Sequence, residues 1–177
     1  KKESQDNDRS FASDVVTKRW KYNQKEEKVG FAHFSMDTME SSGTKKFFAL
    51  TGPIIDTLEN GYTLFVDELD SKLHPNLVEK IVSLFNSKSL NPHNAQLIFN
   101  THNTNLLDSG LLRRDQVWFV EKDNCGNSEL HSLSDFKKIR KNEALESNYL
   151  RGKYGAIPYL EFFNSFTSKF LEYENEG

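Results

Sequence analysis

The sequence lacks the features that mark secreted and membrane proteins. It has a single cysteine, Cys125, among 177 residues, so it forms no intrachain disulfide and a secreted disulfide scaffold is excluded. No apolar run approaches the roughly 20 residues that a membrane-spanning helix needs, and no signal-peptide pattern opens the chain. We therefore expect a cytoplasmic protein with no membrane partner.

Excess positive charge is also absent. The chain has 23 Lys and Arg against 26 Asp and Glu, and the net charge of -3 gives no support to a protein that is basic throughout and binds nucleic acid. The basic cluster at 137–141 suits either a local contact with nucleic acid or a solvated surface. Hydrophobic residues make up 36% of the chain, enough for the core of one folded unit. The first residue is Lys1 rather than Met, which favours a piece of a longer protein.

Polar and charged residues dominate positions 1–28. This segment predicts one short amphipathic helix over 10–20 between flexible stretches, and the folded domain is expected over 29–177. A strand is expected from Val29 to Met36, followed by a loop of small residues at 40–44. A helix over 44–58 follows, kinked or divided by Pro53. Its expected buried side comprises Phe47, Phe48, Leu50, Ile54, Ile55 and Leu58.

The central pattern alternates strands and helices. The apolar runs 62–66 and 95–99 predict strands buried on both faces, as in a parallel sheet, with an amphipathic helix from Pro75 between them. A short helix is expected through Leu106 and Leu107. Strands at 116–121 and 129–133 predict a late hairpin, with helices at 142–150 and from Pro158. The fold class is α/β, with a parallel core flanked by helices.

Two acids, Asp67 and Glu68, follow the first central strand. A strand that ends in carboxylates projects them from the carboxyl edge of a sheet, where open α/β folds bind ligands. Asp67 suits Mg²⁺, and Glu68 suits the polarisation of a water that attacks phosphorus. Strands also end in acids merely for solubility, so the pair alone does not decide the function.

Two further signals flank these acids. Asn100-Thr101-His102 ends the next strand, where an imidazole suits a terminal phosphate and the attacking water, although this histidine taken alone favours a capping or surface role. Ser41-Ser42-Gly43-Thr44 opens a helix, where backbone N–H groups, hydroxyls and the helix dipole suit an anion. A plain N-cap with a glycine turn is the alternative there.

In this order, the motifs resemble the carboxyl-terminal half of an ABC-type ATPase head, as in the SMC, Rad-fifty and overcoming-lysogenization-defect groups. The closest likeness is to ATPases of bacterial anti-phage and abortive-infection systems, which are counted among the AAA proteins. The signature of these proteins is similar to 40–44, their Walker B motif to 64–68, their D-loop to 70–75 and their switch histidine to His102. The run 149–158 also looks like their carboxyl-terminal stretch.

The resemblance implies ATP and Mg²⁺ as cofactors and a homodimer or larger oligomer with composite sites. Asp67 would organise the metal, Glu68 would act as base or water-positioner, and His102 would contact the γ-phosphate. The signature residues Ser41, Ser42, Gly43 and Thr44 would serve the neighbouring subunit's nucleotide, and Ser71 and His74 of the D-loop would also lie at the nucleotide. Hydrolysis would switch the dimer, which would control an effector such as a nuclease or toxin.

The sequence departs from the family pattern in three places. Ser42 replaces the first signature glycine, and His74 stands where many ABC ATPases have aspartate. No G-x-x-x-x-G-K-[ST] loop occurs in the 177 residues, so ATPase competence would depend on an amino-terminal half that supplies this phosphate-binding loop. Two alternatives stay open: a non-catalytic scaffold with a degenerate ATPase fold, and a DNA-repair head of the SMC or Rad-fifty kind.

Overall fold

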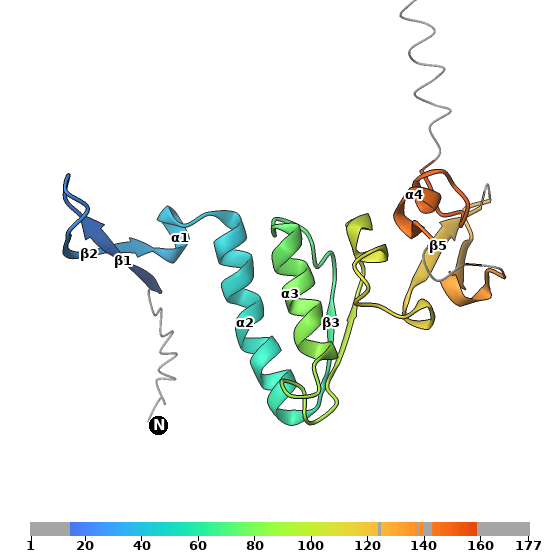
Figure 1. Cartoon of the computed structure of the whole chain (residues 1–177), viewed down its shortest axis with the longest axis horizontal. Helices are drawn as coiled ribbons and strands as arrows, with labels where there is room; N and C mark the ends of the chain where they lie inside the picture. The colour runs from blue at the N-terminus through green and yellow to red at the C-terminus, as the bar shows by residue number, and fades with distance from the viewer. Residues whose placement is uncertain (1–14, 124, 138, 140–142, 159–177) are drawn as a thin grey trace, which may run out of the picture.

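The structure is a computed structural model, and it describes residues 15–123, 125–137, 139 and 143–158. The helix expected from Pro158 lies outside the described residues, apart from its first residue. Figure 1 shows a hairpin, a central block of helices on a sheet, and a carboxyl-terminal unit. The elements, in chain order, are β1 (Val16–Tyr22), β2 (Lys28–Ser35), α1 (Met36–Met39), α2 (Ser42–Asn60), β3 (Thr63–Val66), α3 (Pro75–Asn86), β4 (Gln96–Phe99), the 3₁₀ helices η1 (Thr104–Leu107) and η2 (Arg114–Gln116), β5 (Trp118–Lys122), β6 (Ser128–Ser132), the 3₁₀ helix η3 (Leu133–Asp135) and α4 (Leu145–Leu150).

The hairpin β1–β2 corrects the first expectation. In its described part, the segment predicted as a helix over 10–20 is a strand, because β1 pairs antiparallel with β2. Trp20 lies opposite Phe31, with ring centroids 3.9 Å apart, and such cross-strand aromatic pairs stabilise a sheet. Apolar residues at alternate positions of β1 suit a strand as well as the helical spacing, and pairing with β2 decides between them.

Glu40 joins this hairpin to the start of α2. Its carboxylate accepts hydrogen bonds from Arg19 Nη2 at 2.7 Å (Oε1) and 2.6 Å (Oε2), and another from the hydroxyl of Thr17. The Glu40 side chain is only 3% exposed, whereas that of Arg19 is 58% exposed. A nearly buried carboxylate needs such donors, because an unpaired buried charge is costly. One side chain therefore fixes β1 against the turn before α2.

We expect Glu40→Ala to destabilise the protein by about 1.5–3 kcal/mol, since it removes charge-assisted hydrogen bonds from two donors. Urea unfolding of the complete protein measures the change. Glu26→Ala, at an exposed position in the β1–β2 turn, is the control and should change stability by less than about 0.5 kcal/mol. Equal stability of Glu40→Ala and the wild type would show that the hairpin is held by other contacts.

Helix α2 is continuous, so the expected division at Pro53 does not occur. Proline has no N–H, so the Ala49 carbonyl lacks its usual i+4 donor at Pro53. Both residues are exposed, and this carbonyl therefore lies on the solvent side of the helix. The expected buried side is only partly correct. Ile54 is buried and Leu50 and Leu58 pack on the core, whereas Phe47, Phe48 and Ile55 are exposed.

Strands β3 and β4 pair in parallel, as predicted, with Val66 opposite Phe99. Leu64, Val66, Leu97 and Phe99 pack with α2 and α3, which carry the buried residues Ile54, Val78, Ile81 and Val82. The prediction that both faces are buried is wrong. On the other face Phe65 is 72% exposed and Ile98 46% exposed. The helices therefore cover one face of this two-stranded sheet and leave the other open.

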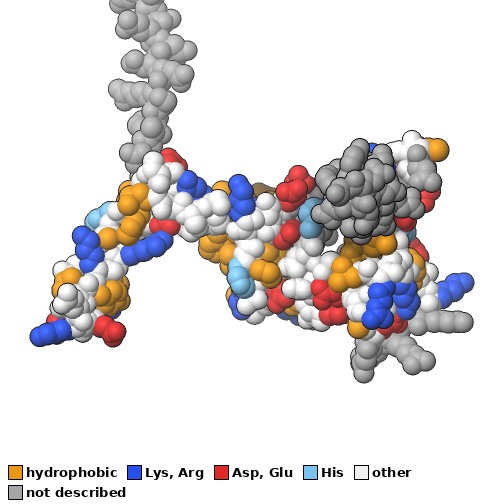
Figure 2. Space-filling view, turned by 90° about the horizontal axis from the view of Figure 1, so that it is seen from above, with side chains coloured by type: hydrophobic (Ala, Val, Ile, Leu, Met, Phe, Trp, Pro, Cys, Tyr) orange, Lys and Arg blue, Asp and Glu red, His pale blue; other side chains and the backbone are white. Residues whose placement is uncertain are grey.

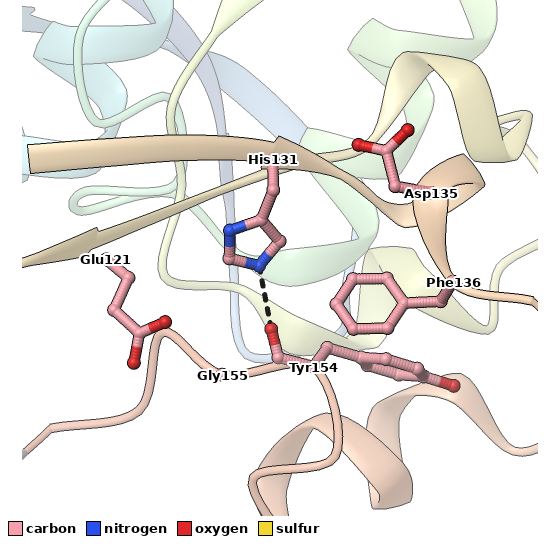
Figure 3. A pocket seen from close by; sticks show the side chains of 6 residues that line it. All are labelled: Glu121, His131, Asp135, Phe136, Tyr154 and Gly155. Carbon is pink, nitrogen blue, oxygen red and sulfur yellow. Dashed lines mark hydrogen bonds between the residues drawn. The ribbon is translucent and has the colours of Figure 1, made fainter.

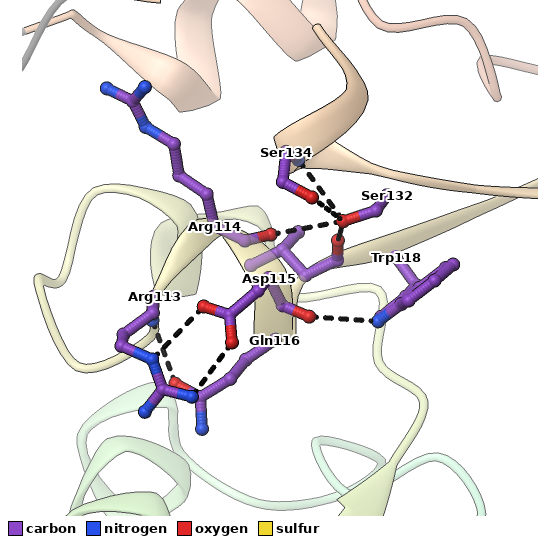
Figure 4. A network of polar contacts seen from close by, with 8 residues as sticks. Arg113, Arg114, Asp115, Gln116, Trp118, Ser132 and Ser134 are labelled. Atoms are coloured by element: carbon purple, nitrogen blue, oxygen red, sulfur yellow. Dashed lines mark hydrogen bonds and ion pairs between the residues drawn. The ribbon is translucent and has the colours of Figure 1, made fainter.

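The carboxyl-terminal unit contains the predicted hairpin, now defined as β5–β6. Figure 4 shows how its base is fixed: the Ser132 hydroxyl donates to the Arg114 carbonyl, and Trp118 Nε1 donates to the Asp115 carbonyl at 3.1 Å. Arg113 forms an ion pair with Asp115 at 2.9 Å. The run 149–158 supplies Tyr149 and Tyr154, both of which stack on Phe119.

In the described part of the chain, every helix is too short or too polar to cross a bilayer. On the face that Figure 2 shows, hydrophobic side chains of the β1–β2 hairpin lie beside lysines and arginines. Lys18 Nζ, for example, lies 3.7 Å from the centre of the Phe31 ring, a cation–π contact.

Candidate functional site

The carboxyl edge of the β3–β4 sheet brings the two central motifs together. Since β3 and β4 are parallel and Val66 pairs with Phe99, Asp67 and Asn100 are the next residues on neighbouring strands. Asn100 Nδ2 donates to Asp67 Oδ1 at 2.6 Å, and Asn100 Oδ1 accepts the backbone N–H of Glu68 at 2.5 Å. Both acids are exposed at this edge, where a ligand can reach them.

The turn that follows β3 has an unusual backbone. Glu68 (φ 47°) and Lys72 (φ 62°) both adopt the left-handed conformation, which costs free energy in residues other than glycine. Leu69, which is fully buried, anchors the turn in the core, and its N–H donates to the Asn100 carbonyl at 3.1 Å. The position of Glu68 is thus set by core packing and by the neighbouring strand.

Asp70 connects this turn to the histidine motif. Its Oδ1 accepts the Thr101 hydroxyl at 2.6 Å and the backbone N–H of His102 at 3.2 Å. Burial alone would raise the pKa of Asp70, but these hydrogen bonds and the nearby His102 ring hold its pKa below the ordinary value of 3.8. His102 therefore stands at the same sheet edge as the acids, with its backbone N–H bound to Asp70.

A depressed pKa stabilises the folded state above the unfolded pKa, and that contribution is lost as the pH falls through the folded pKa. We expect Asp70→Asn to cost about 1 kcal/mol of unfolding free energy at pH 7. Wild type and variant should converge as the pH falls below about 3.8. Urea unfolding at a series of pH values measures this, with Glu59→Gln on the exposed surface of α2 as the control. A difference that does not change with pH would contradict the role given to the charge.

The segment 41–44 forms the predicted helix start. Ser41 is the N-cap of α2, and its Oγ accepts the Thr44 N–H at 3.1 Å and lies 2.9 Å from Thr44 Oγ1. The two hydroxyls are therefore hydrogen-bonded to each other, while Ser42 is exposed. Lys46, one turn further along α2, donates from Nζ to the Glu68 carbonyl. The start of α2 thus contacts the turn that carries the second acid.

Gly43 allows this close approach. A Cβ at this position would lie 2.6 Å from the Lys72 carbonyl oxygen, closer than real Cβ contacts come. Because that oxygen belongs to the backbone of the turn after β3, a side chain at 43 requires this turn to move. The glycine therefore allows the start of α2 to lie against the turn.

Gly43→Ala should destabilise the protein by about 1–3 kcal/mol through this overpacking. Gly52→Ala is a matched control in the same helix, because a Cβ there meets nothing within 4 Å. The control should be neutral or up to about 1 kcal/mol more stable, as alanine favours helix. Thermal unfolding of both variants measures the change in stability. Equal destabilisation by the two substitutions would show that the contact with Lys72 is not its cause.

The remaining predicted site residues have more local contacts. His74 is the N-cap of α3, and its Nδ1 accepts the Asn76 N–H at 3.2 Å, which leaves the hydrogen of a neutral ring on Nε2. The Ser71 N–H donates to the Glu68 carbonyl at 3.0 Å. Ser71 therefore helps to close the turn after β3, and His74 begins the next helix. In the carboxyl-terminal unit, His131 Nε2 donates a 2.8 Å hydrogen bond to the Tyr154 carbonyl and so joins β6 to the segment after α4 (Figure 3).

Asp67 is the described residue best suited to Mg²⁺. The described residues contain no group of three or more His, Cys, Asp or Glu side chains placed to enclose a metal ion. Mg²⁺, however, is usually held by one or two carboxylates together with substrate phosphates and waters rather than by a protein cage. The exposed carboxylate of Asp67 fits that requirement. Asn100 Nδ2 orients it by donating a hydrogen bond to Asp67 Oδ1.

Sequence reasoning missed Asn100, Asp70, Thr101 and Lys46 as contributors to this site. The first three lie inside the motifs 70–75 and 100–102, but their contacts are hydrogen bonds across the sheet edge, which the sequence of a motif does not indicate. A signal for Asn100 was present in the sequence. It is a polar residue directly after one predicted strand, and Asp67 has the same position after the neighbouring parallel strand. Lys46 gave no such signal, because its contact with Glu68 depends on how α2 crosses the sheet.

The fold and the site together define a class. Helices on a parallel β-sheet, with carboxylates at its carboxyl edge, are the arrangement in which α/β proteins bind ligands. A family model described as "AAA domain, putative AbiEii toxin, Type IV TA system" matches residues 2–108, more than half of the chain. The chain therefore belongs to this family of AAA domains. Membership indicates a nucleotide-binding, ATPase-like domain from the setting of abortive-infection and toxin–antitoxin systems. Comparisons with curated proteins and with solved structures find no match.

Proposed function

We propose that this chain is the carboxyl-terminal part of an ABC-type, ATP-hydrolysing head that acts as a nucleotide-controlled dimer in an anti-phage defence system. In this proposal the ATPase is the sensor or regulator of an effector such as a nuclease or toxin. The observation that carries it is the meeting of Asp67, Glu68 and His102 at one sheet edge, fastened through Asn100 and Asp70. Membership of the AAA domain family supports the same reading.

The chemistry follows from the residues at that edge. Asp67 would hold Mg²⁺, which neutralises phosphate charge when it is bound with ATP. Glu68 would accept a proton from, or orient, the water that attacks the γ-phosphorus, and His102 would hydrogen-bond the γ-phosphate. Hydrolysis breaks the bond between the γ-phosphorus and the bridging oxygen, and ADP and phosphate leave.

The start of α2 has a different place in this proposal. Its hydroxyl pair, Ser41 and Thr44, and the backbone at Ser42 and Gly43 would approach the nucleotide bound by a second subunit, so that each site is shared. Ser71 and His74 of the D-loop would lie at the same interface. Two contacts join the start of α2 to the turn after β3: the hydrogen bond from Lys46 to the Glu68 carbonyl and the close approach of Gly43 to Lys72. They support a rigid connection between the residues for the chain's own nucleotide and those for the neighbouring subunit's nucleotide.

The phosphate-binding loop would come from a further polypeptide segment, the amino-terminal half of the same ATPase. The open face of the β3–β4 sheet supports this part of the proposal. Parallel sheets are usually covered on both faces, and Phe65 and Ile98 are exposed on this one. Added strands and their loop would cover these side chains and bring the phosphate cradle to the edge where Asp67 lies.

The test is Glu68→Gln in the complete ATPase, that is, this chain together with the segment that supplies the phosphate-binding loop. The change keeps the side chain's shape and removes the charge needed to activate water. We expect steady-state ATP hydrolysis to fall on the order of 10²-fold or more, with ATP still bound. ATP-bound dimers should accumulate in the variant, as measured by light scattering.

Glu59→Gln, an exposed carboxylate near the other end of α2, is the matched control and should hydrolyse ATP at the wild-type rate. Unchanged hydrolysis in Glu68→Gln would remove the role given to Glu68. Mg·ATP binding with no hydrolysis in the wild type would favour the non-catalytic scaffold instead. Loss of hydrolysis without accumulation of dimers would leave an ATPase but contradict the shared-site arrangement.

A further inference from the structure

Asn100 contacts the end of β3 through both its side chain and its backbone. It is the first residue after β4, and it lies beside Asp67 because Val66 and Phe99 are paired. Its side chain bonds Asp67 and the N–H of Glu68, and its carbonyl accepts the N–H of Leu69 at 3.1 Å. Three consecutive residues of the neighbouring strand's exit are therefore held by one residue.

The chemistry of the amide matches these partners on both sides. Oδ1 meets an N–H donor, and Nδ2 meets a carboxylate acceptor, so only this orientation of the amide satisfies both contacts. A carboxylate at position 100 would keep the acceptor for Glu68 but place a second negative charge against Asp67. An aliphatic side chain would lose both hydrogen bonds.

Glu68 has a particular need for such a partner. Its left-handed backbone (φ 47°) costs roughly 1–3 kcal/mol and persists only where the surroundings determine it. Asn100 holds its N–H at 2.5 Å, and Lys46 holds its carbonyl from the other side. The backbone conformation decides the direction in which the Glu68 carboxylate leaves the turn, and this carboxylate is itself exposed.

We propose that Asn100 is a positioning residue that aims both acids of the site: it fixes the strained backbone of Glu68 and orients the carboxylate of Asp67. The inference rests on the proposed ATPase function and gives Asn100, which there only joins the two strand ends, a part in turnover. Asn100 touches neither the nucleotide nor the attacking water in this scheme. It acts through the two acids, so its loss should lower turnover more than nucleotide binding.

Two substitutions in the complete ATPase separate its contacts. Asn100→Leu removes both side-chain hydrogen bonds and leaves the Leu69 N–H bond to the backbone carbonyl of residue 100 in place. We expect kcat to fall about 10- to 100-fold at saturating Mg²⁺, with KM for ATP changed less than about threefold. Asn100→Asp keeps the acceptor for the Glu68 N–H. It should therefore retain a kcat clearly above that of Asn100→Leu, within about tenfold of the wild type.

The same two changes at Asn105, an exposed residue of η1, are the matched controls and should leave kcat and KM unchanged. A second readout does not depend on turnover. Calorimetric titration of Mg·ATP into Asn100→Leu, built in the Glu68→Gln background, should show the same number of sites as Glu68→Gln alone. A lower number of sites would mean that the substitution damages the fold, and the positioning role would then be overturned.

Wild-type kcat in Asn100→Leu would overturn the inference. A fall in Asn100→Asp as deep as that in Asn100→Leu would overturn the role given to the Glu68 N–H contact. If Glu68→Gln lowers hydrolysis as expected while Asn100→Leu keeps the wild-type kcat, the inference fails and the proposed function stands. If the wild-type protein hydrolyses no ATP, the proposed function fails and the inference fails with it.

Discussion

The backbone pairing of β3 with β4 determines where each polar group of the candidate site stands. Parallel strands end at the same edge of a sheet, and the register that pairs Val66 with Phe99 sets Asp67 beside Asn100. A shift of one residue would turn Phe65 toward the helices and would separate the Asn100 amide from its two partners. The apolar contacts of Leu64 and Leu97 with α2 and α3 thus hold the polar contacts in register.

Much of the central fold could be predicted from the sequence, because its signals are local. The runs 62–66 and 95–99 are short, apolar and followed by polar residues, and both form strands at nearly those positions. Pro75 marks the start of α3, because a proline in the first turn lacks an N–H that would have no partner there. Ser41 caps α2, because its hydroxyl accepts one of the free N–H groups of the first turn. The edge that carries Asp67, Glu68 and His102 was predicted for the same reason.

What could not be predicted depends on partners distant in the sequence. The residues of β1 have spacing that fits either a helix or a strand, and only β2 decides between them. The full burial expected for β3 assumed a sheet of several strands covered on both faces, whereas in the described residues this sheet consists of β3 and β4. The contacts of Glu40 with Arg19 and Thr17 join residues more than 20 positions apart, and no local pattern announces them. The roles of the site residues themselves remain predictions.

The attachment of α4 has a consequence for the stability of this short helix. Both oxygens of Asp108 accept N–H groups at the start of this helix, from Leu145 at 2.7 Å and Glu146 at 3.3 Å, and Thr104 donates to the Glu146 carboxylate. A six-residue helix is not stable alone in water, because nucleation costs more than so few hydrogen bonds return. Asp108, which supplies both acceptors, lies 37 positions upstream, directly after η1, so the helix gains these bonds only when the intervening loop is closed. The stability of α4 therefore depends on the segment that follows β4.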